Sequence, residues 1–489
     1  MRKIVLLVAS VTLAILVFST LVGKTPTASQ TTPAKPNFVF ILTDDMRKDD
    51  LAYLPKTRKL IGSQGMKFNN AYVPLASCCP SRATVLRGQY VHNHKVWYSI
   101  PNGPDSGWEG WSVQGHESDN LATRMRGGGY RTGLFGKYFN GYTSTGAPPP
   151  GWSDFFAKNT GSGYFNYSMN DNGVTKSYGS APADYFTDVL STESQQFIQQ
   201  SVKRSKPFFL YVAPNAPHEP STPAPRHVNS FNGEPAAHLP SYNEVDVSDK
   251  PPWISSLPTI SSTEEAAIQA RHENRVETLQ AVDEMVGALV KKLSATGQLS
   301  NTYIVFTSDN GWQHGEHLIV EEKERPYEES SHMPLLIRGP GVTAGSTADS
   351  LVTFPDFMPT FLELGGIAIP SYVDGSSLVP LLNGTVNDDD TVTDDWRNAI
   401  LLEGHAREEG LNYPERDYFA IRTADGLKYI EYRSGFKEFY DLASDPYEMN
   451  SNPSRAPAAL VDRLQRLKTC AADTCHAIER EKSGTTPSP

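Results

Sequence analysis

Short apolar runs recur along the chain and predict the strands of a buried sheet. They are NFVFILTDD (37–45), TGLFGKY (132–138), PFFLYVAPNAPHEP (207–220), TYIVFTSDNG (302–311) and PLLIRGP (334–340). Unbroken apolar runs are typical of strands covered on both faces of a parallel sheet. Between them, residues 264–293 place Val276, Leu279 and Val282 at three-residue steps, which predicts a helix. Strands that alternate with helices predict an α/β sandwich around a mostly parallel sheet.

The hydrophobic pattern changes at about residue 394. Residues 418–446 alternate apolar and polar positions and carry turn signals at Gly426 and Gly435, which predicts an antiparallel meander. A final helix is predicted over 458–467. We therefore expect a large domain over 36–393, a smaller domain with an antiparallel sheet over 394–478, and a disordered tail over 479–489.

The N-terminus has the pattern of an export leader. Arg2 and Lys3 precede an apolar run over 4–22, so residues 1–22 are predicted to be a signal peptide. At roughly nineteen residues the run could also span a bilayer as an uncleaved anchor. Residues 23–35 are rich in Thr and Pro and predict a tether. Both alternatives place the folded part outside the cytoplasm, either secreted or held at a membrane by this segment alone.

Charge and cysteine content narrow the function further. The 489 residues include 44 basic and 55 acidic side chains, a formal charge of −11, which argues against a nucleic-acid partner. Anionic substrates remain possible, because local positive charge can lie within a negative surface. Of the four cysteines, Cys470 and Cys475 are the expected disulfide, with two free thiols as the alternative. Cys78 and Cys79 are then left without partners.

Polar side chains follow the predicted strands at their carboxyl ends. They are Asp44, Asp45, Lys137, His218, Asp309 and Asn310. Open α/β sheets bind ligands at this edge, so we expect these groups to gather there. The oxygen ligands among them suit Ca²⁺ or Mg²⁺, whereas a single Asp-Asp pair could simply cap a helix or a turn.

Positive side chains near this edge suggest what the site binds. Arg82 and Lys323 join Lys137 and His218 as candidate cations, although each alone could be a solvated surface residue. A metal together with several cations predicts a tetrahedral oxyanion, either sulfate or phosphate, as the bound group.

The stretch SCCPSRATVLRG places Cys78 at the start of a predicted helix, because Pro80 suits a first helical turn. A helix N-terminus binds anions and lowers the pKa of a thiol. A thiolate nucleophile and a buried inert cysteine are both compatible with that position.

The same stretch resembles the C-x-P-x-R signature of type I sulfatases. Read from Cys78, the motif places its proline and arginine at Pro80 and Arg82; read from Cys79, Ser81 would occupy the proline position. ILTDDMR, CCPSRATVLRGQYVHNH, GLFGKYFNGY, APHEP, TSDNGW and KERPYE follow one another in the family order. The resemblance covers about residues 36–475 and is strongest to the N-acetylglucosamine-6-sulfatase and glucosamine-6-endosulfatase branch. EFYDLASDPYE resembles the small second domain of that family.

The resemblance implies a fold and a set of cofactors. It implies an alkaline-phosphatase-like α/β/α sandwich with a small C-terminal α+β domain. Cys78 would be oxidised to formylglycine by a formylglycine-generating enzyme. The Ca²⁺ ligands, in preference to Mg²⁺, would be residue 78 with Asp44, Asp45, Asp309 and Asn310.

The resemblance also implies roles in catalysis. Arg82 would orient formylglycine 78, and the sulfate oxygens and protons would be handled by Lys137, His218 and Lys323. One hydroxyl of the hydrated aldehyde would attack sulfur, and the other would then expel sulfate.

The sequence departs from the family at one point. Many members have G-K-W-H, with a histidine that acts as base, where this chain has GKYFN. His92 or His94 could serve as the base for the hydrate or could line the sugar pocket, and we expect the lining role. The expected pocket residues are His94, Asn140, Trp312 and His314. His317 is a similar candidate, and for His314 and His317 ordinary loop hydrogen bonding is the alternative.

The expected function is hydrolysis of a sulfate ester on a sugar, of the N-acetylglucosamine-6-sulfate type. An arylsulfatase, or a phosphodiester or phosphonate hydrolase of the same fold, is the first alternative. A non-catalytic binder of sulfated glycans is the second, and it would apply if Cys78 stayed unmodified.

Overall fold

The computed structural model describes residues 35–101, 103–161, 163–320, 322–385, 396–405, 407–408 and 411–482. The predicted leader at 1–22, nearly all of the tether and the last residues of the tail lie outside these ranges. The predicted domain boundary between residues 393 and 394 also lies outside these ranges. Among the described residues, no helix combines the length and apolar character needed to cross a membrane.

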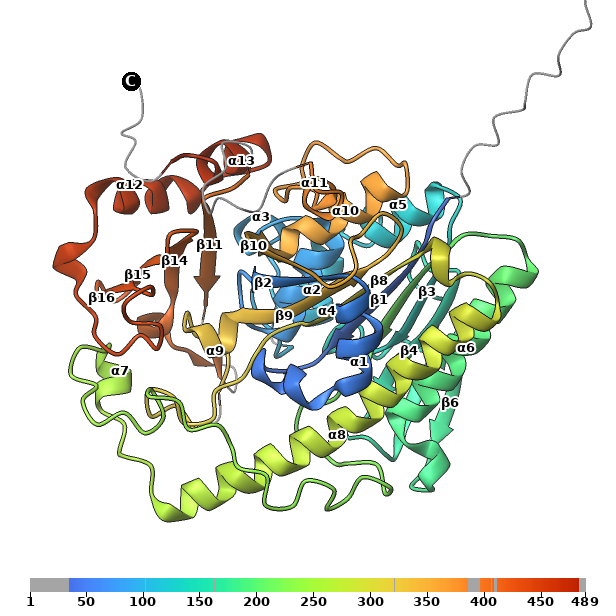
Figure 1. The fold of residues 1–489 in the computed structure, drawn as a ribbon, viewed down its shortest axis with the longest axis horizontal. Coiled ribbons are helices and arrows are strands. Elements are labelled where there is room, and N and C mark those ends of the chain that lie inside the picture. The colour runs from blue at the N-terminus through green and yellow to red at the C-terminus, as the bar shows by residue number, and fades with distance from the viewer. Residues whose placement is uncertain are drawn as a thin grey trace, which may run out of the picture. The chain divides into compact units, whose positions relative to one another are not determined.

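A ten-stranded sheet forms the centre of the fold (Figure 1). Its strands are β1 (Asn37–Thr43), β2 (Met66–Tyr72), β3 (Arg131–Gly136), β4 (Asp154–Thr160), β5 (Tyr167–Asp171), β6 (Val174–Tyr178), β7 (Phe208–Ala213), β8 (Thr302–Ser308), β9 (His332–Arg338) and β10 (Ser346–Thr353). Their order is β10-β2-β9-β8-β1-β7-β3-β4-β5-β6. The five strands from β8 to β4 are mutually parallel. The apolar runs predicted four of them, β8, β1, β7 and β3, and did not predict β4.

One of the predicted strands runs against the others. β9 pairs antiparallel with both β8 and β2, and the β5–β6 hairpin adds antiparallel strands at the far edge. A buried antiparallel strand has the same apolar run as a parallel one, so hydropathy alone does not give its direction.

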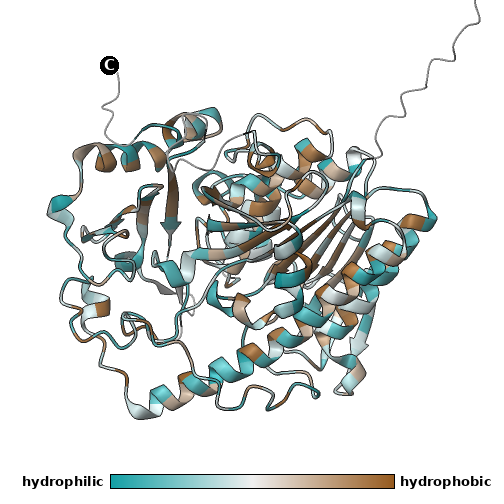
Figure 2. Cartoon of the chain, in the orientation of Figure 1, coloured by the Kyte–Doolittle hydropathy of each residue, from teal (hydrophilic) through white to brown (hydrophobic). Residues whose placement is uncertain are grey.

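Helices cover both faces of the sheet. α2 (Cys78–Arg87), α5 (Leu121–Gly127) and α10 (Phe357–Leu364) share one apolar core, and α6 (Phe186–Lys203) and α8 (Ser262–Ala295) share the other. The pleat of β1 sends Phe38 and Phe40 into the first core and Val39 and Ile41 into the second. Figure 2 shows the central strands as hydrophobic along most of their length.

Short elements complete the fold. They are α1 (Pro55–Leu60), α3 (Val91–His94), α4 (Gly107–Val113), α7 (Pro252–Ser255), α9 (Glu328–Ser331), α11 (Val379–Leu382), β12 (Arg407–Glu408) and β13 (Leu411–Asn412).

The C-terminal part is a second sheet with its own helices. β11 (Ala399–Gly404), β14 (Tyr418–Thr423), β15 (Leu427–Tyr432) and β16 (Lys437–Asp441) form an antiparallel sheet in that order. α12 (Ala458–Leu467) and α13 (Asp473–Glu479) follow. Cys470 and Cys475 form a disulfide, the pair that the sequence predicted. The sheet joins the large domain directly, since the Glu403 N–H donates to the Pro74 carbonyl at 2.8 Å.

The end of the chain differs from the sequence prediction. The disordered tail was expected from residue 479, but Glu479 is the last residue of α13 and is buried. Its carboxylate lies 3.2 Å from Arg397, which is also buried. The ordered part therefore extends to residue 482, and only residues 483–489 of the predicted tail lie outside the described chain.

Candidate active site

The carboxyl ends of β1 and β8 bring four oxygen-bearing side chains together. The two strands are adjacent and parallel, so the residues that follow them emerge at the same edge of the sheet. Asp45 donates its N–H to Asp309 Oδ1 at 3.1 Å, and Asn310 Nδ2 donates to Asp45 Oδ1 at 2.6 Å. Asp44 lies beside them, and all four residues are buried. The sequence prediction of a cluster at this edge matches this geometry.

Cys78 is the first residue of α2 and points into this cluster. Its Sγ lies 3.3 Å from Asp44 Oδ1, and Lys323 Nζ lies 3.0 Å from the sulfur. Burial raises the pKa of the Cys78 thiol well above its ordinary value, and the Asp44 charge raises it further. These surroundings disfavour a thiolate, so the helix N-terminus does not by itself make Cys78 a nucleophile.

Two lysines neutralise the first carboxylate pair. Lys137 Nζ lies 2.5 Å from Asp44 Oδ2, and Lys323 Nζ lies 2.5 Å from Asp45 Oδ1. Burial alone would raise the pKa of both carboxyls, but the ammonium groups lower it in each case. Asp44 and Asp45 are therefore charged at neutral pH, and both lysines keep their protons.

Arg82 ties the helix to the carboxylates. It lies about one helical turn after Cys78 and donates Nε and Nη2 to Asp309 Oδ2 at 3.0 and 2.8 Å. Nη1 donates to the Lys137 carbonyl at 3.0 Å. The guanidinium is fully buried, so these bonds fix the position of α2 against the strand ends.

His218 follows β7 and approaches the cluster from its open side. One ring nitrogen, Nδ1, lies 2.7 Å from the Glu219 carbonyl, and the other, Nε2, lies 3.8 Å from Asp45 Oδ2. Because Nδ1 faces a carbonyl, it carries the ring proton and Nε2 is free to accept one. Burial lowers the pKa of His218 despite the nearby carboxylates.

The cluster has the properties of a site for a hard divalent cation. Ligand atoms of Asp44, Asp45, Cys78 and Asp309 all lie within 4.8 Å of one another. Within the described chain, Asp45 Oδ2 and Asn310 Oδ1 are buried without a hydrogen-bond partner. Burial, followed by the Asp44 charge, raises the pKa of Asp309 to about 6 although Arg82 is bonded to it. A bound cation would satisfy the free oxygens and relieve the repulsion between the neighbouring carboxylates.

A cleft of about 310 Å³ opens beside the cluster. Three predicted residues line it: Lys137, Asn140 and His218. Lys158 and Asn159 of β4 also line it, and the sequence analysis missed both. The apolar core of DFFAKNT, residues 154–160, could have indicated the strand that carries them.

His94 does not reach this cleft. It is fully buried, its Nε2 lies 3.0 Å from Thr84 Oγ1, and its Nδ1 accepts the Val96 N–H at 3.1 Å. His92 is also occupied, with Nδ1 3.0 Å from Glu403 and Nε2 2.8 Å from a main-chain carbonyl. The structure therefore gives both histidines framework contacts, in place of the expected lining or base role.

Trp312 and His314 also do not line the cleft. The Trp312 ring centroid is 5.7 Å from Lys323 Nζ, so it supports the cluster from one side. His314 is 3% exposed, and its N–H donates to Glu316 Oε2 at 2.6 Å. Of the four expected pocket residues, Asn140 alone lines the 310 Å³ cleft.

Cys79 has a structural position. It is buried, its N–H donates to Ser99 Oγ at 2.9 Å, and its Sγ accepts the Asn140 N–H at 3.2 Å. Phe139, at the place where many sulfatases have a histidine, stacks on Trp111 in the core with centroids 4.9 Å apart. The GKYFN segment therefore supplies packing, and no base, at that position.

Comparison with known proteins gives consistent matches. The sulfatase family model matches residues 36–367, and the model for the C-terminal domain of N-sulphoglucosamine sulphohydrolase matches residues 315–469. The human N-acetylglucosamine-6-sulfatase is 33% identical, over 90% of this chain and 86% of that protein. The extracellular sulfatase SULF-1 homolog of Drosophila melanogaster is 35% identical over 77% of this chain. This chain spans 33% of the length of that fly protein.

A solved structure has the same fold. It is a complex of a protein with its substrate D-glucosamine-2-N,6-O-disulfate, with a TM-score of 0.72 and 24% identity. The match covers 92% of this chain and 100% of the solved one. The phosphonate monoester hydrolase of Agrobacterium radiobacter has a TM-score of 0.66 at 22% identity. The fold alone therefore does not separate sulfate from phosphonate chemistry.

Proposed function

Because the chain belongs to the sulfatase family and is a sulfuric ester hydrolase, we propose that it removes the 6-O-sulfate from N-acetylglucosamine units of a glycosaminoglycan-like chain. The observation that carries this proposal is Cys78, held in the C-x-P-x-R register with its Sγ among buried carboxylates and beside Lys323. The named function of the human relative supports the choice of sugar.

We further propose that residue 78 works as formylglycine and that Ca²⁺ binds the carboxylate cluster. The ligands would be residue 78 with Asp44, Asp45, Asp309 and Asn310, which have the buried, unsatisfied oxygens such an ion needs. Formylglycine supplies a hydrated aldehyde as nucleophile, and Ca²⁺ supplies positive charge next to the sulfate.

The chain's own residues orient the substrate and hold its charge. Lys137 and Lys323 keep their protons beside the carboxylates, so they can bind two sulfate oxygens as the negative charge shifts during reaction. Lys323 keeps its proton and is the candidate to protonate the leaving oxygen, whereas His218, with a lowered pKa and a free Nε2, would have to take up a proton first. Arg82 acts through its bonds to Asp309 and the Lys137 carbonyl, which set the position of the first turn of α2.

The location proposed is outside the cytoplasm. The charged and apolar N-terminus, the Cys470–Cys475 disulfide and the name of the Drosophila relative as an extracellular sulfatase all support it. A sulfated glycan would be met there. Maturation would require a formylglycine-generating enzyme in the producing cell.

The substrate assignment is tested by a comparison of kcat/KM. The esters are N-acetylglucosamine-6-sulfate, galactose-6-sulfate, an aryl sulfate and an aryl phosphodiester, with enzyme made in a host that generates formylglycine. We expect N-acetylglucosamine-6-sulfate to be preferred at least about tenfold, or ~1.4 kcal/mol of transition-state preference. A tenfold preference for another sulfate would overturn the sugar assignment and keep the sulfatase. No turnover of any ester by formylglycine-bearing protein would favour the glycan binder.

Lys158 predicts a pH dependence in the cleft. Its Nζ donates to the Gly163 carbonyl at 2.7 Å, and burial, followed by the Lys137 charge, lowers its pKa to about 7. Lys158 is therefore a cation below about pH 7 and neutral above it, so it can pair with a second anionic group on the sugar only at the lower pH. We expect KM for D-glucosamine-2-N,6-O-disulfate to rise about fivefold between pH 6 and 8, the effect of ~1 kcal/mol of ion pairing.

Two controls test this prediction, one with a variant and one with a second substrate. Lys158→Met should remove the pH dependence of KM for the disulfate. With the wild-type enzyme, KM for the 6-O-monosulfate should change less with pH than KM for the disulfate. An equal rise in KM for both sugars, or for both enzymes, would contradict the assignment of the effect to Lys158.

A further inference from the structure

A second cluster of potential metal ligands lies away from the catalytic carboxylates. A ring nitrogen of His317, a carboxylate oxygen of Glu329 and one of Glu448 all lie within 4.8 Å of one another. His317 follows β8, Glu329 is in α9, and Glu448 follows β16 in the C-terminal part. The cluster therefore joins three segments that are distant in the sequence, and the proposed reaction uses none of these side chains.

His317 is oriented as metal-binding histidines are. It is fully buried, and its Nδ1 lies 2.6 Å from Glu244 Oε2. Nδ1 therefore carries the proton and donates it to Glu244, which leaves the lone pair on Nε2. Nε2 is buried and has no hydrogen-bond partner in the described part of the chain. A histidine held by a carboxylate through one nitrogen, with the other nitrogen free, is the usual arrangement around zinc.

Of the two carboxylates, Glu329 faces this space with an unsatisfied oxygen. Glu329 Oε2 is buried and lacks a hydrogen bond among the described residues. Glu448 is already engaged, because Lys428 Nζ lies 2.7 Å from its Oε1 and the Glu328 N–H donates to its Oε2 at 3.0 Å. Lys428 Nζ also lies 3.2 Å from Glu328, so it is shared between the two carboxylates. Glu329 forms no ion pair with any described residue.

Burial makes the charged form of Glu329 costly. Desolvation, followed by the nearby Glu316 and Glu448 charges, raises the pKa of Glu329 to about 8, so the carboxyl holds a proton at neutral pH when nothing else compensates its charge. A dication at this place would take the position of that proton and satisfy the free His317 nitrogen and the free Glu329 oxygen at once.

We propose that His317 Nε2, Glu329 and Glu448 bind a Zn²⁺ ion that fastens the C-terminal part of the chain to the loop after β8. One imidazole nitrogen with two carboxylates suits Zn²⁺, whereas Ca²⁺ prefers oxygen ligands alone. Glu244 holds the histidine in place from behind, and water would complete the tetrahedral coordination.

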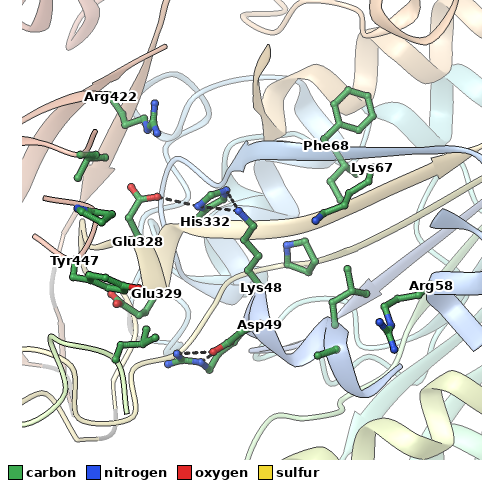
Figure 3. Close-up of a pocket in the computed structure, with 18 residues that line it drawn as sticks. Lys48, Asp49, Arg58, Lys67, Phe68, Glu328, Glu329, His332, Arg422 and Tyr447 are labelled. Atoms are coloured by element: carbon green, nitrogen blue, oxygen red, sulfur yellow. Dashed lines mark hydrogen bonds and ion pairs between the residues drawn. The ribbon is translucent and has the colours of Figure 1, made fainter. Parts of the chain in front are cut away.

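A neighbouring cavity reaches one of the three proposed ligands. A cavity of about 630 Å³ is lined by Glu329 together with Glu328, Lys48 and Tyr447. Figure 3 shows Glu329 among the residues that line this cavity. Tyr447 directly precedes Glu448 in the sequence, so Glu329 lies on the cavity wall and Glu448 is next in the chain to a residue of that wall.

The test measures zinc binding without reference to turnover, so it can fail while the proposed sulfatase function stands. Protein purified without chelator is saturated with Ca²⁺, dialysed, and titrated with ZnCl₂ by calorimetry, with zinc content measured by mass spectrometry. We expect one Zn²⁺ per chain and a zinc-dependent rise in Tm of about 3 °C or more. Co²⁺ in its place should give the visible absorption of a tetrahedral site.

Variants assign the metal to these residues. Glu329→Gln and His317→Gln should each lower zinc affinity at least tenfold and remove the rise in Tm, and Glu244→Gln should lower affinity about 10–100-fold. His238→Gln and Glu265→Gln, at exposed positions, are the matched controls and should bind as wild type. If His317→Gln does not fold, Glu329→Gln on the cavity wall decides the question.

Two results would overturn the proposal. The first is wild-type protein that binds no zinc beyond the level of Glu329→Gln. The second is zinc binding that survives both Glu329→Gln and His317→Gln, which would place the ion elsewhere. In either case, a protonated Glu329 beside a neutral His317 would be the better description of the cluster.

Discussion

Cys78→Ala is expected to lower sulfatase kcat/KM by at least about 10³-fold, while Cys79→Ala retains most of the activity. The two side chains are adjacent in sequence but have different surroundings. Cys78 Sγ contacts Asp44 and Lys323, whereas Cys79 Sγ accepts the Asn140 N–H on the core side of the helix. The reaction therefore depends on the chemistry of the first and only on the packing of the second.

Mass spectrometry of tryptic peptides checks the cause of this difference. Protein from a host with the formylglycine-generating enzyme should carry the aldehyde at residue 78, and protein from a host without it should carry cysteine there and be inactive. Modification at Cys79, or full activity of the unmodified protein, would contradict the assignment. Equal losses in both variants would mean that the helix start, and not residue 78, was disturbed.

The strand ends could be predicted from the sequence because they follow simple physical patterns. A buried parallel strand is an unbroken apolar run, and the polar residues directly after it emerge at the ligand-binding edge. Asp44 and Asp45 after β1, and Asp309 and Asn310 after β8, follow this rule and are found together. Cys78 could be placed because Pro80 indicated the start of its helix.

The cleft could not be predicted with the same success, because it depends on side-chain direction. His94 and His314 are close in sequence to site residues, yet the turns of their segments direct them into the interior. Lys158 was missed because β4 lies near the edge of the sheet and has a short, mixed pattern instead of a long apolar run. The His317 cluster was missed because Glu448 comes from the C-terminal part, and hydropathy does not show how the two sheets dock.

Asp309→Ala is expected to abolish turnover and to destabilise the fold. Asp309 accepts two bonds from Arg82 through Oδ2 and one from the Asp45 N–H through Oδ1. Its removal leaves the buried guanidinium without its main carboxylate, which costs about 3–5 kcal/mol of the free energy of unfolding. It also removes one of the proposed Ca²⁺ ligands.

Asp309→Asn is the matched variant that separates these two effects. The amide keeps the size of the side chain and can still accept a bond from Arg82, but it lacks the negative charge that strengthens the binding of a divalent cation. Denaturation in Ca²⁺ and in chelator should show a Ca²⁺-dependent gain in stability for wild type and little for either variant. Asp309→Ala should be less stable than Asp309→Asn in chelator as well, because only Ala leaves Arg82 unpaired. If either variant recovered full turnover after chelation and return of Ca²⁺, the proposed cation could not lie at this cluster, and the buried carboxylates would have to be explained by Lys137, Lys323 and Arg82 alone.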